Sequence, residues 1–421
     1  MKILLVGNGG REHALAWRLA QSPSAPKLYA TRPNAGLARL AESVDLGVEQ
    51  VEELVTWAGE QGIDLTVVGP ELPLTLGIVD RFQQAGLQIW GPSQAAARLE
   101  GSKAFAKDVM TRAGVPTAAY GAFSDLEEAK SWVRAFGRPV VVKADGLAAG
   151  KGVILCQTAE EAESALDSML TDGAFGDAGS RVVVEELLLG EEASYIALCD
   201  GLHVLPLASS QDHKRVGEGD TGPNTGGMGA YSPAPVVDAE LEQQIIDEVM
   251  MPTLRTMADM GAPFVGFLYA GIMVTAEGPK VLEFNVRMGD PETQPLMMRL
   301  NSDLIEVLQT GLAGNLDEVV LDWDPRSALT VVMCSEGYPA SSRKGDVIEG
   351  LAEADAVTDA HVFVAGAQLE GSEVLTSGGR VLGVTGLGAT LQDAAGKAYE
   401  AVEHISWPGA HYRSDIGWRA L

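Results

Sequence analysis

Apolar strands and helices alternate over roughly the first hundred residues, and this rhythm restricts the fold more than any other feature of the sequence. Strands are expected at 3–6, 65–68 and 87–90, and helices at about 51–61 and from 75 to about 85. A strand followed by a helix and another strand forms a right-handed parallel unit. We therefore expect a doubly wound parallel sheet, which binds ligands beyond the carboxyl ends of its strands.

The first strand leads into a glycine-rich loop, Gly7-Asn8-Gly9-Gly10-Arg11-Glu12-His13, and then into a helix. Free N–H groups and the helix dipole suit this junction to an anion. A dinucleotide fingerprint would need glycine in place of Glu12 and an acidic residue near Thr31-Arg32. The loop therefore disfavours NAD and indicates a single phosphate, with Arg11 assisting. Glycines that only pack a strand against a helix are the alternative.

Asn8, Asn34 and Glu71 all fall at the carboxyl ends of expected strands. Glu71 precedes Leu72-Pro73 and follows Pro70, and its carboxylate could accept hydrogen bonds from sugar hydroxyls. A solvated loop acid is the alternative for Glu71.

Lys143 follows an apolar strand, and the glycine-rich stretch with Gly150-Lys151-Gly152 comes before the next strand, 154–156. A Walker A loop would need a glycine where Asp145 stands, Ser or Thr where Gly152 stands, and a helix afterwards. We predict instead a hairpin tip that closes over phosphates. Lys143 would contact the same phosphates from a fixed position on its strand.

Glu283, Asn285 and Arg287 occupy alternate positions at the end of an expected strand, so they share one face. Carboxylate and carboxamide oxygens suit a hard cation such as Mg²⁺ that also carries phosphate oxygens. An arginine beside them could hold a carboxylate or a phosphoryl group in bidentate fashion. An edge strand with a polar outer face is the alternative.

A polar loop over 209–235 carries Asp212, Lys214 and several glycines. A loop of this length inside a compact domain is usually functional, although a mobile linker is the alternative. Upstream, the strand 181–184 ends in Glu185-Glu186. Its backbone could bind the edge of an adenine while a later glutamate reaches the ribose.

The composition limits the partners of the chain. Its 421 residues hold 58 acidic against 30 basic side chains, a net charge of −28. This balance argues against nucleic acid or an anionic membrane as the main partner. The three cysteines are far apart and have no zinc spacing, and no apolar run approaches the length of a membrane span. We expect a cytoplasmic protein, ending in a small α+β cap domain.

In this order, a strand lysine, a glycine-rich hairpin, an E-E-x-L strand end and a late E-x-N pair resemble the ATP-grasp superfamily. The closer resemblance covers essentially the whole chain and is to the phosphoribosylamine–glycine ligases. It is carried by six motifs: 7–13, 69–74, 143–153, 211–215, 222–229 and 287–294. It implies ligation of glycine to 5-phosphoribosylamine at the expense of ATP, in purine biosynthesis. Another carboxylate–amine ligase and a regulatory nucleotide-binding protein are the rivals.

The resemblance also implies a multidomain α/β and α+β fold, with an ATP-grasp core of two α+β subdomains. We expect a phosphoribosylamine-binding domain (1–101), a linker and lid subdomain (102–190), a central subdomain with the metal and glycine site (191–325) and the cap (326–421). The implied partners are small molecules only, and we expect a monomer.

The implied site residues fall into four groups. Contacts to ATP are Lys103, Lys143, Gly150, Lys151, Gly152, Glu185, Glu186, Leu188 and Glu192. Contacts to phosphoribosylamine and glycine are Asn8, Gly9, Gly10, Arg11, Asn34, Glu71, Asp212, Lys214, Arg287, Gly289 and Asp290. The implied catalytic side chains are Arg287, Lys143 and Lys151, and Glu283 and Asn285 would hold Mg²⁺ or Mn²⁺.

Two positions depart from the family pattern. The strand 269–273 lacks the acidic metal ligand that many ATP-grasp enzymes have there, so the metal would rest on Glu283 and Asn285. The turn before Asn34 is Arg32-Pro33, where the family more often has Pro-Gly.

Overall fold

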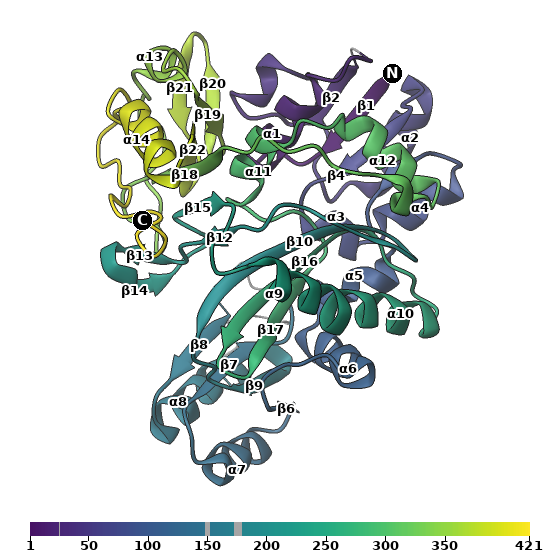
Figure 1. The fold of residues 1–421 in the computed structure, drawn as a ribbon, viewed down its shortest axis with the longest axis vertical. Helices are drawn as coiled ribbons and strands as arrows, with labels where there is room; N and C mark the ends of the chain where they lie inside the picture. The colour runs from purple at the N-terminus through teal and green to yellow at the C-terminus, as the bar shows by residue number, and fades with distance from the viewer. Residues whose placement is uncertain (25, 148–151, 172–178) are drawn as a thin grey trace.

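A parallel five-stranded sheet forms the N-terminal part of the chain, in the order β3-β2-β1-β4-β5 (Figure 1). The structure is a computed structural model that describes residues 1–24, 26–147, 152–171 and 179–421. The strands are β1 (Lys2–Val6), β2 (Lys27–Thr31), β3 (Glu42–Val44), β4 (Leu65–Val68) and β5 (Ile89–Trp90). The helices are α1 (Gly10–Leu19), α2 (Val51–Gln61), α3 (Glu71–Thr75), α4 (Ile78–Gln84) and α5 (Gln94–Gly101). This arrangement confirms the predicted doubly wound sheet.

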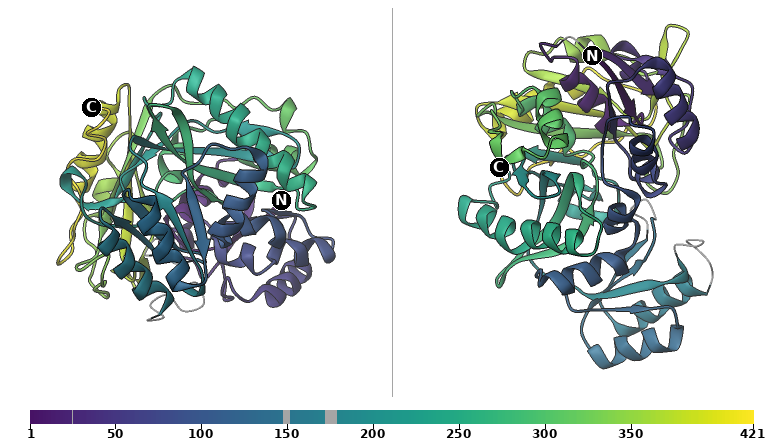
Figure 2. Two further views of the ribbon diagram at one scale, coloured as in Figure 1. Left: turned by 90° about the horizontal axis from the view of Figure 1, so that it is seen from below. Right: turned by 90° about the vertical axis from the view of Figure 1, so that its right-hand side faces the viewer.

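A small α+β subdomain follows and projects from the rest of the molecule, as the right-hand view of Figure 2 shows. Its antiparallel sheet has the order β6-β9-β7-β8. The helices α7 and α8 close a separate apolar core against this sheet. The elements of this subdomain are β6 (Tyr120–Phe123), α7 (Leu126–Phe136), β7 (Val140–Ala144), β8 (Val153–Cys156), α8 (Ala159–Leu170) and β9 (Val182–Glu186). The helix α6 (Lys103–Ala113) precedes them and packs in the core of the rest of the molecule.

A second antiparallel sheet, β11-β10-β16-β17, lies between this subdomain and the N-terminal sheet. Its strands are β10 (Glu191–Asp200), β11 (Val204–Pro206), β16 (Val265–Thr275) and β17 (Gly278–Asn285). The helical segment 239–259 consists of α9 (Ala239–Ile245), a π-helical turn (Ile246–Met250) and α10 (Met251–Asp259). Residues from β1, β4, β10, β16 and α10 share one apolar core. This core fixes the two sheets relative to each other at the junction where the site lies.

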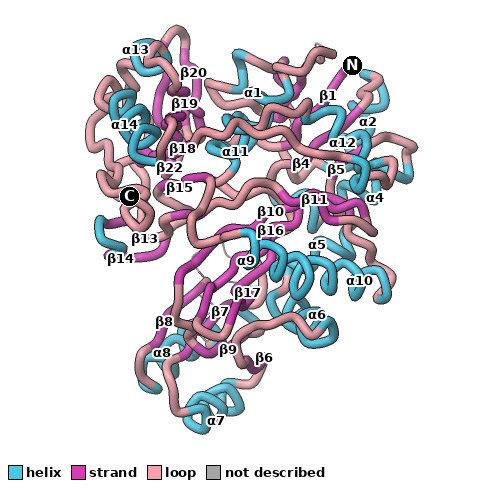
Figure 3. The backbone as a smooth tube through the Cα atoms, in the orientation of Figure 1, coloured by secondary structure: helices cyan, strands magenta, loops and turns pink. Residues whose placement is uncertain are grey.

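The C-terminal sheet has the order β12-β15-β18-β22-β19, and its first two strands come from the predicted loop over 209–235. That segment holds β12 (Gln211–Asp212), β13 (Arg215–Gly217), β14 (Thr221–Asn224) and β15 (Gly229–Ser232). Figure 3 shows how loops link these short strands to the C-terminal sheet. The expectation of one long loop is therefore wrong, because β15 pairs with β18 along its whole length.

The remaining elements complete the C-terminal domain and its connection. They are α11 (Thr293–Arg299), α12 (Leu304–Leu312), β18 (Ser327–Cys334), α13 (Leu351–Asp355), β19 (Ala360–Val364), β20 (Ala367–Glu370), β21 (Glu373–Thr376), β22 (Arg380–Gly388) and α14 (Leu391–Val402). Val347 forms an isolated bridge to Leu375. Within the described residues, no helix is long and apolar enough to cross a membrane.

Candidate active site

Glu283 and Asn285 lie on the polar face of β17, as their spacing predicts. Glu283 is opposite Gly271 of β16, and Asn285 is opposite Tyr269. A register shift at Leu282 leaves Val281 and Phe284 both buried on the other face. The bulge therefore keeps the apolar side in the core while both oxygen-bearing side chains face the site.

Four cationic side chains converge on Glu283, from four different elements. Burial alone would raise the pKa of this carboxyl, but the cations together hold the pKa below its ordinary value; they are Lys214, Lys143, Lys103 and Arg287. All four were predicted site residues, and the fold brings them together. Such a concentration of positive charge suits a polyanionic ligand.

Arg287 lies just beyond β17 and is held by two acidic residues of the N-terminal domain. Its Nη2 donates to Oε1 of Glu100 at 2.7 Å and to Oδ1 of Asn285 at 3.0 Å. Its Nε is 3.4 Å from Oε2 of Glu71. Glu71 begins α3, where Arg287 and Arg11 offset the effect of burial and lower its carboxyl pKa.

Lys143 is tied to two other groups of the protein. Its Nζ lies 2.9 Å from Oε1 of Glu185 and donates to the Leu282 carbonyl at 3.0 Å. The second oxygen of Glu185 lies 2.9 Å from Nζ of Lys107, a buried lysine that the sequence did not single out. The side chain of Glu185 is therefore engaged by two lysines inside the protein.

The other residues of the expected adenine strand have different surroundings. Glu186 pairs with Arg138 at 2.8 Å, and Leu188 packs against Ala118 and Met273. Glu192 pairs with Lys214 at 2.7 Å. The carboxylates of Glu186 and Glu192 are thus both held by cations.

The serine before α6 fixes Lys103 beside the hairpin. Ser102 caps α6 by accepting from Phe105 N, and it donates to the carboxylate of Asp145. Lys103 Nζ then reaches the Gly146 carbonyl at 3.0 Å. Gly152 is buried, and its carbonyl accepts from Ala144 N. The predicted residues Gly150 and Lys151 lie outside the described residues.

The glycine-rich loop before α1 is filled by the side chain of Glu12. This carboxylate accepts from Gly9 N at 2.5 Å and from Arg11 Nε at 2.5 Å. A Cβ at Gly7 or Gly69 would lie within 3.0 Å of the Glu12 side chain, so both positions require glycine. Glu12 therefore lies beside this helix N-terminus.

The side chain of Asn34 stabilises the glycine-rich loop through hydrogen bonds to the backbone. Its Nδ2 donates to the carbonyls of Asn8 and Val364 at 2.8 and 2.7 Å, and its Oδ1 accepts from two backbone N–H groups. Asn8 donates to the Arg32 carbonyl, and Arg11 Nη1 reaches the Met288 carbonyl at 3.3 Å. The loop is thereby linked to the segment that follows β17.

Asp212, the last residue of β12, and Lys214, two residues after it, reach the same region. Burial raises the pKa of the Asp212 carboxyl, and Glu292, Glu192 and Glu283 add to this rise against the effect of Lys214. Asp212 and Lys214 thus face the acidic side of the cluster around Glu283.

Gly289 and Asp290 complete the loop opposite Gly9 and Gly10. Asp290 pairs with Arg380 of the C-terminal domain at 3.2 Å and accepts from Gln294 Nε2 at 3.0 Å. A Cβ at Gly10 would lie 2.9 Å from Gln294 Nε2 and 3.7 Å from Asp290. Three domains therefore meet at this loop.

Three family models match the chain in succession. They are phosphoribosylglycinamide synthetase N domain (residues 1–100), its ATP-grasp (A) domain (101–293) and its C domain (328–419). The phosphoribosylamine–glycine ligases of Brucella melitensis and Allochromatium vinosum are 54% and 57% identical over the full chain, and cover 98% and 99% of those proteins. The chain belongs to the phosphoribosylamine–glycine ligase family.

Solved structures agree with this membership. The phosphoribosylamine–glycine ligase of Thermotoga maritima superposes with a TM-score of 0.88 at 32% identity, covering 99% of this chain and 100% of that one. A biotin carboxylase from Campylobacter jejuni has a TM-score of 0.75 at 17% identity, covering 98% and 92% of the two chains, and shares the fold alone. Our division at residues 101, 190 and 325 stays a prediction.

Sequence reasoning missed three residues of this family member's site, namely Glu100, Lys107 and Arg380. Each contacts a predicted residue from a distant segment: Glu100 holds Arg287, Lys107 holds Glu185, and Arg380 holds Asp290. Lys107 lies four residues after Lys103 on α6, which was the one available signal.

The donor set around β17 fits a hard cation only in part. Within the described residues, no three His, Cys, Asp or Glu side chains gather as a metal site. Glu283 and Asn285 supply two oxygen-bearing groups, and Asn285 Oδ1 already accepts from Arg287. A Mg²⁺ ion here would take its other ligands from phosphates and water, as is usual for this ion.

Proposed function

We propose that the chain joins glycine to 5-phosphoribosylamine, giving glycinamide ribonucleotide, ADP and phosphate, the second step of de novo purine synthesis. The observation that carries the proposal is the convergence of Lys103, Lys143, Lys214 and Arg287 on Glu283. A nucleoside triphosphate needs such a charge concentration. The 54–57% identity to phosphoribosylamine–glycine ligases indicates that glycine and 5-phosphoribosylamine are the other two substrates.

The reaction has two steps that balance without a protein nucleophile. A carboxylate oxygen of glycine attacks the γ-phosphorus of ATP, the bond to the β–γ bridging oxygen breaks, and glycyl phosphate and ADP form. The amine nitrogen of phosphoribosylamine then attacks the glycyl carbon, phosphate leaves with the electron pair of the C–O bond, and the nitrogen releases a proton. Catalysis rests on positioning and charge stabilisation.

Lys143 and Arg287 have the positions for this task. Lys143 projects from β7 and donates to the Leu282 carbonyl, and Arg287 is held by Glu100. In our proposal both offset the negative charge of the transferring group, and Lys151 adds a third cation when the hairpin closes. Closure would exclude water, which would otherwise hydrolyse the acyl phosphate.

The other predicted residues divide between the substrates. We assign Gly9, Gly10 and Arg11 to the sugar phosphate, with Asn8, Asn34 and Glu71 shaping that side. Asp212 and Lys214 are assigned to glycine, beside Gly289 and Asp290. Glu185, Glu186, Leu188 and Glu192 are assigned to adenosine, and Lys103, Gly150 and Gly152 to the phosphates of ATP. Because Asn34 uses its side chain on the protein backbone, its proposed role is to shape the loop.

Glu283 and Asn285 would hold Mg²⁺ or Mn²⁺. A divalent ion there supplies charge neutralisation for the phosphates. We also propose that the chain acts as a monomer in the cytoplasm, without nucleic acid or membrane, in line with its net charge of −28. Light scattering of the purified protein tests the monomer.

Phosphate release from ATP tests the proposed reaction. Release should require glycine and phosphoribosylamine together, and bicarbonate should not replace glycine. Glu283→Ala should lower the rate at least a hundredfold, whereas Glu277→Ala, which removes an exposed glutamate near the start of β17, should not. Release by the wild type without glycine would contradict the proposal.

A further inference from the structure

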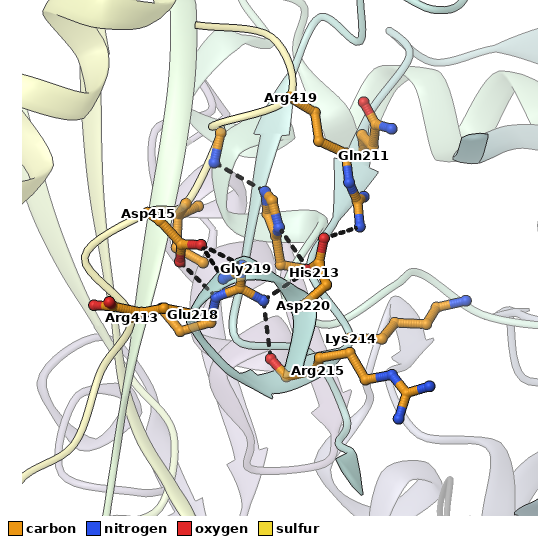
Figure 4. Close-up of polar contacts among 12 residues, drawn as sticks. Gln211, His213, Lys214, Arg215, Glu218, Gly219, Asp220, Arg413, Asp415 and Arg419 are labelled. Carbon is orange, nitrogen blue, oxygen red and sulfur yellow. Dashed lines mark hydrogen bonds and ion pairs between the residues drawn. The ribbon is translucent and has the colours of Figure 1, made fainter. Parts of the chain in front are cut away.

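The C-terminal tail, residues 413–419, contacts the segment that carries Asp212 and Lys214 (Figure 4). Arg413 is completely buried, with ion pairs of 2.9 Å to Asp220 and 2.7 Å to Asp415. The second oxygen of Asp220 lies 2.6 Å from Nη2 of Arg419. The turn at 218–220 is therefore held by the C-terminal tail from almost 200 residues away.

The same tail fixes the ring of His213, which lies between Asp212 and Lys214 in the sequence. The side chain of His213 is completely buried, and its Nε2 accepts from Gly417 N at 2.9 Å. Nε2 is thus the unprotonated nitrogen, and the ring proton is on Nδ1. Nδ1 lies 3.6 Å from Oδ1 of Asp220, the carboxylate that the two arginines hold. Burial, with the charges of Arg413 and Arg419, lowers the pKa of His213 to about 4, so the ring is neutral.

The backbone on either side of His213 belongs to the C-terminal sheet. His213 N donates to the Gly229 carbonyl at 2.9 Å, and Met228 N donates to the His213 carbonyl at 2.7 Å. Asp212 pairs with Ala230 of β15, which in turn pairs with β18. In an extended segment, neighbouring side chains point to opposite sides.

Because of this alternation, the two faces of the segment make different contacts. His213 points into the tail network, whereas Lys214 points away from it in Figure 4 and pairs with Glu192 at 2.7 Å. Asp212 interacts with Lys214, Glu292 and Glu283 on the site side. Rotation of this segment would therefore move the His213 ring and the two site residues together.

We infer that the C-terminal tail, acting through Arg413, Asp220 and His213, positions Asp212 and Lys214 for the amino-acid substrate. The three are positioning residues, because none of them contacts the cluster around Glu283. The inference rests on the proposed function, in which Asp212 and Lys214 bind glycine. A tail that merely fastens the C-terminal sheet would instead stabilise the protein without affecting one substrate selectively.

Asp220→Asn tests the inference against a closely matched control. Asp220 and Asp359 both have a left-handed backbone, with φ of +58° and +61°, which asparagine tolerates. Both pair with arginine, Asp220 with Arg413 at 2.9 Å and Asp359 with Arg326 at 2.9 Å. The ion pair of Asp359 is with Arg326, far from the 211–215 segment in the sequence, so Asp359→Asn removes the same kind of pair at another place.

We expect Asp220→Asn to raise the KM for glycine about tenfold, because a small misplacement of binding groups weakens binding strongly. The KM for ATP should change less than twofold, and Asp359→Asn should change neither. In a Lys214→Met background, Asp220→Asn should add little to the KM for glycine, because both changes act at one place.

Equal changes in the KM for glycine from Asp220→Asn and Asp359→Asn would overturn the inference, as would full additivity with Lys214→Met. A lowered melting temperature with an unchanged KM for glycine would show that the tail only stabilises the fold. If the wild type releases no phosphate in response to glycine, the proposed function itself fails, which is a separate outcome.

Discussion

Glu100 holds Arg287 and the backbone before it with its two carboxylate oxygens. Oε1 accepts from Arg287 Nη2 at 2.7 Å, and Oε2 accepts from Val286 N at 2.8 Å. Glu100 lies in the last turn of α5 in the N-terminal domain, whereas Arg287 follows β17 of the central sheet. The contact therefore sets where the arginine stands relative to the proposed sugar-phosphate loop.

Glu100→Gln should lower kcat about tenfold to a hundredfold while the protein stays folded. Glutamine can still accept from Val286 N, but it loses the negative charge that fixes the guanidinium, and misorientation of this kind has effects of about that size. Steady-state phosphate release measures the change. The control is Glu52→Gln, which removes an exposed partner of Arg81 in the same domain. An unchanged kcat with reduced stability would limit Glu100 to a structural role.

Lys107→Met should weaken ATP binding through Lys143. The two oxygens of Glu185 lie 2.9 Å from Nζ of Lys107 and Nζ of Lys143. When Lys107 is removed, the full charge of Glu185 acts on Lys143, and Lys143 then attracts the phosphates of ATP less strongly. Burial lowers the pKa of Lys107 to about 8, against the attraction of Glu185. The KM for ATP of the wild type should accordingly rise as the pH increases through 8, and Lys107→Met should show the raised KM at every pH.

Lys130→Met, which removes the surface partner of Asp167, is the control for that variant. If the pH profile of the KM for ATP is the same in wild type and Lys107→Met, Lys107 does not act through Lys143.

Local patterns were enough to predict the N-terminal sheet and the face that Glu283 shares with Asn285. The periodicity of buried strands and the two-residue repeat of a β-strand are properties of neighbouring residues. The helix at Val51–Gln61 was predicted to the residue for the same reason, since Gly62 ends it with φ of +63°. The ATP-grasp architecture came from the order of the motifs.

Contacts between distant segments could not be predicted in this way. Glu100 and Arg287 are 187 positions apart, and Arg413 and Asp220 are 193 positions apart. No local pattern distinguishes such an acid from a solvated one. The short strands β12 and β15 were interpreted as loop because glycines and polar residues dominate 209–235. β15 pairs with β18, and β12 pairs with β15. Tertiary context decides such segments.

His13 should make the stability of the protein fall as the pH decreases below 6.5. Its Nδ1 accepts from Val364 N at 2.8 Å, and burial, with His361 nearby, lowers its pKa to about 3. The unfolded chain therefore binds a proton below pH 6.5 that the folded chain does not bind. This residue alone should reduce the free energy of unfolding by about 1.4 kcal/mol per pH unit between these values.

Urea unfolding of wild type and His13→Asn at pH 7 and 4.5 measures this effect. Asparagine can still accept from Val364 N, so the stability advantage of the wild type should shrink by about 2–3 kcal/mol at the lower pH. His404→Asn, at an exposed position, is the control. An advantage that is equal at both pH values would contradict the prediction.

Arg380→Met should affect both stability and substrate binding, and a second change can separate the two effects. Arg380 donates to the Asp290 and Gly226 carbonyls at 2.6 and 2.5 Å and pairs with the Asp290 carboxylate at 3.2 Å. Its loss leaves a buried carboxylate without its cation, which costs about 3 kcal/mol of folding free energy.

Adding Asp290→Asn to Arg380→Met should recover much of that stability, but not the KM for phosphoribosylamine, because Asp290 lies beside Gly10 in the proposed site. Lys397→Met, at an exposed pair with Glu400 in the same domain, should change neither quantity. Recovery of the KM together with the stability in the double variant would mean that Asp290 has no part in binding.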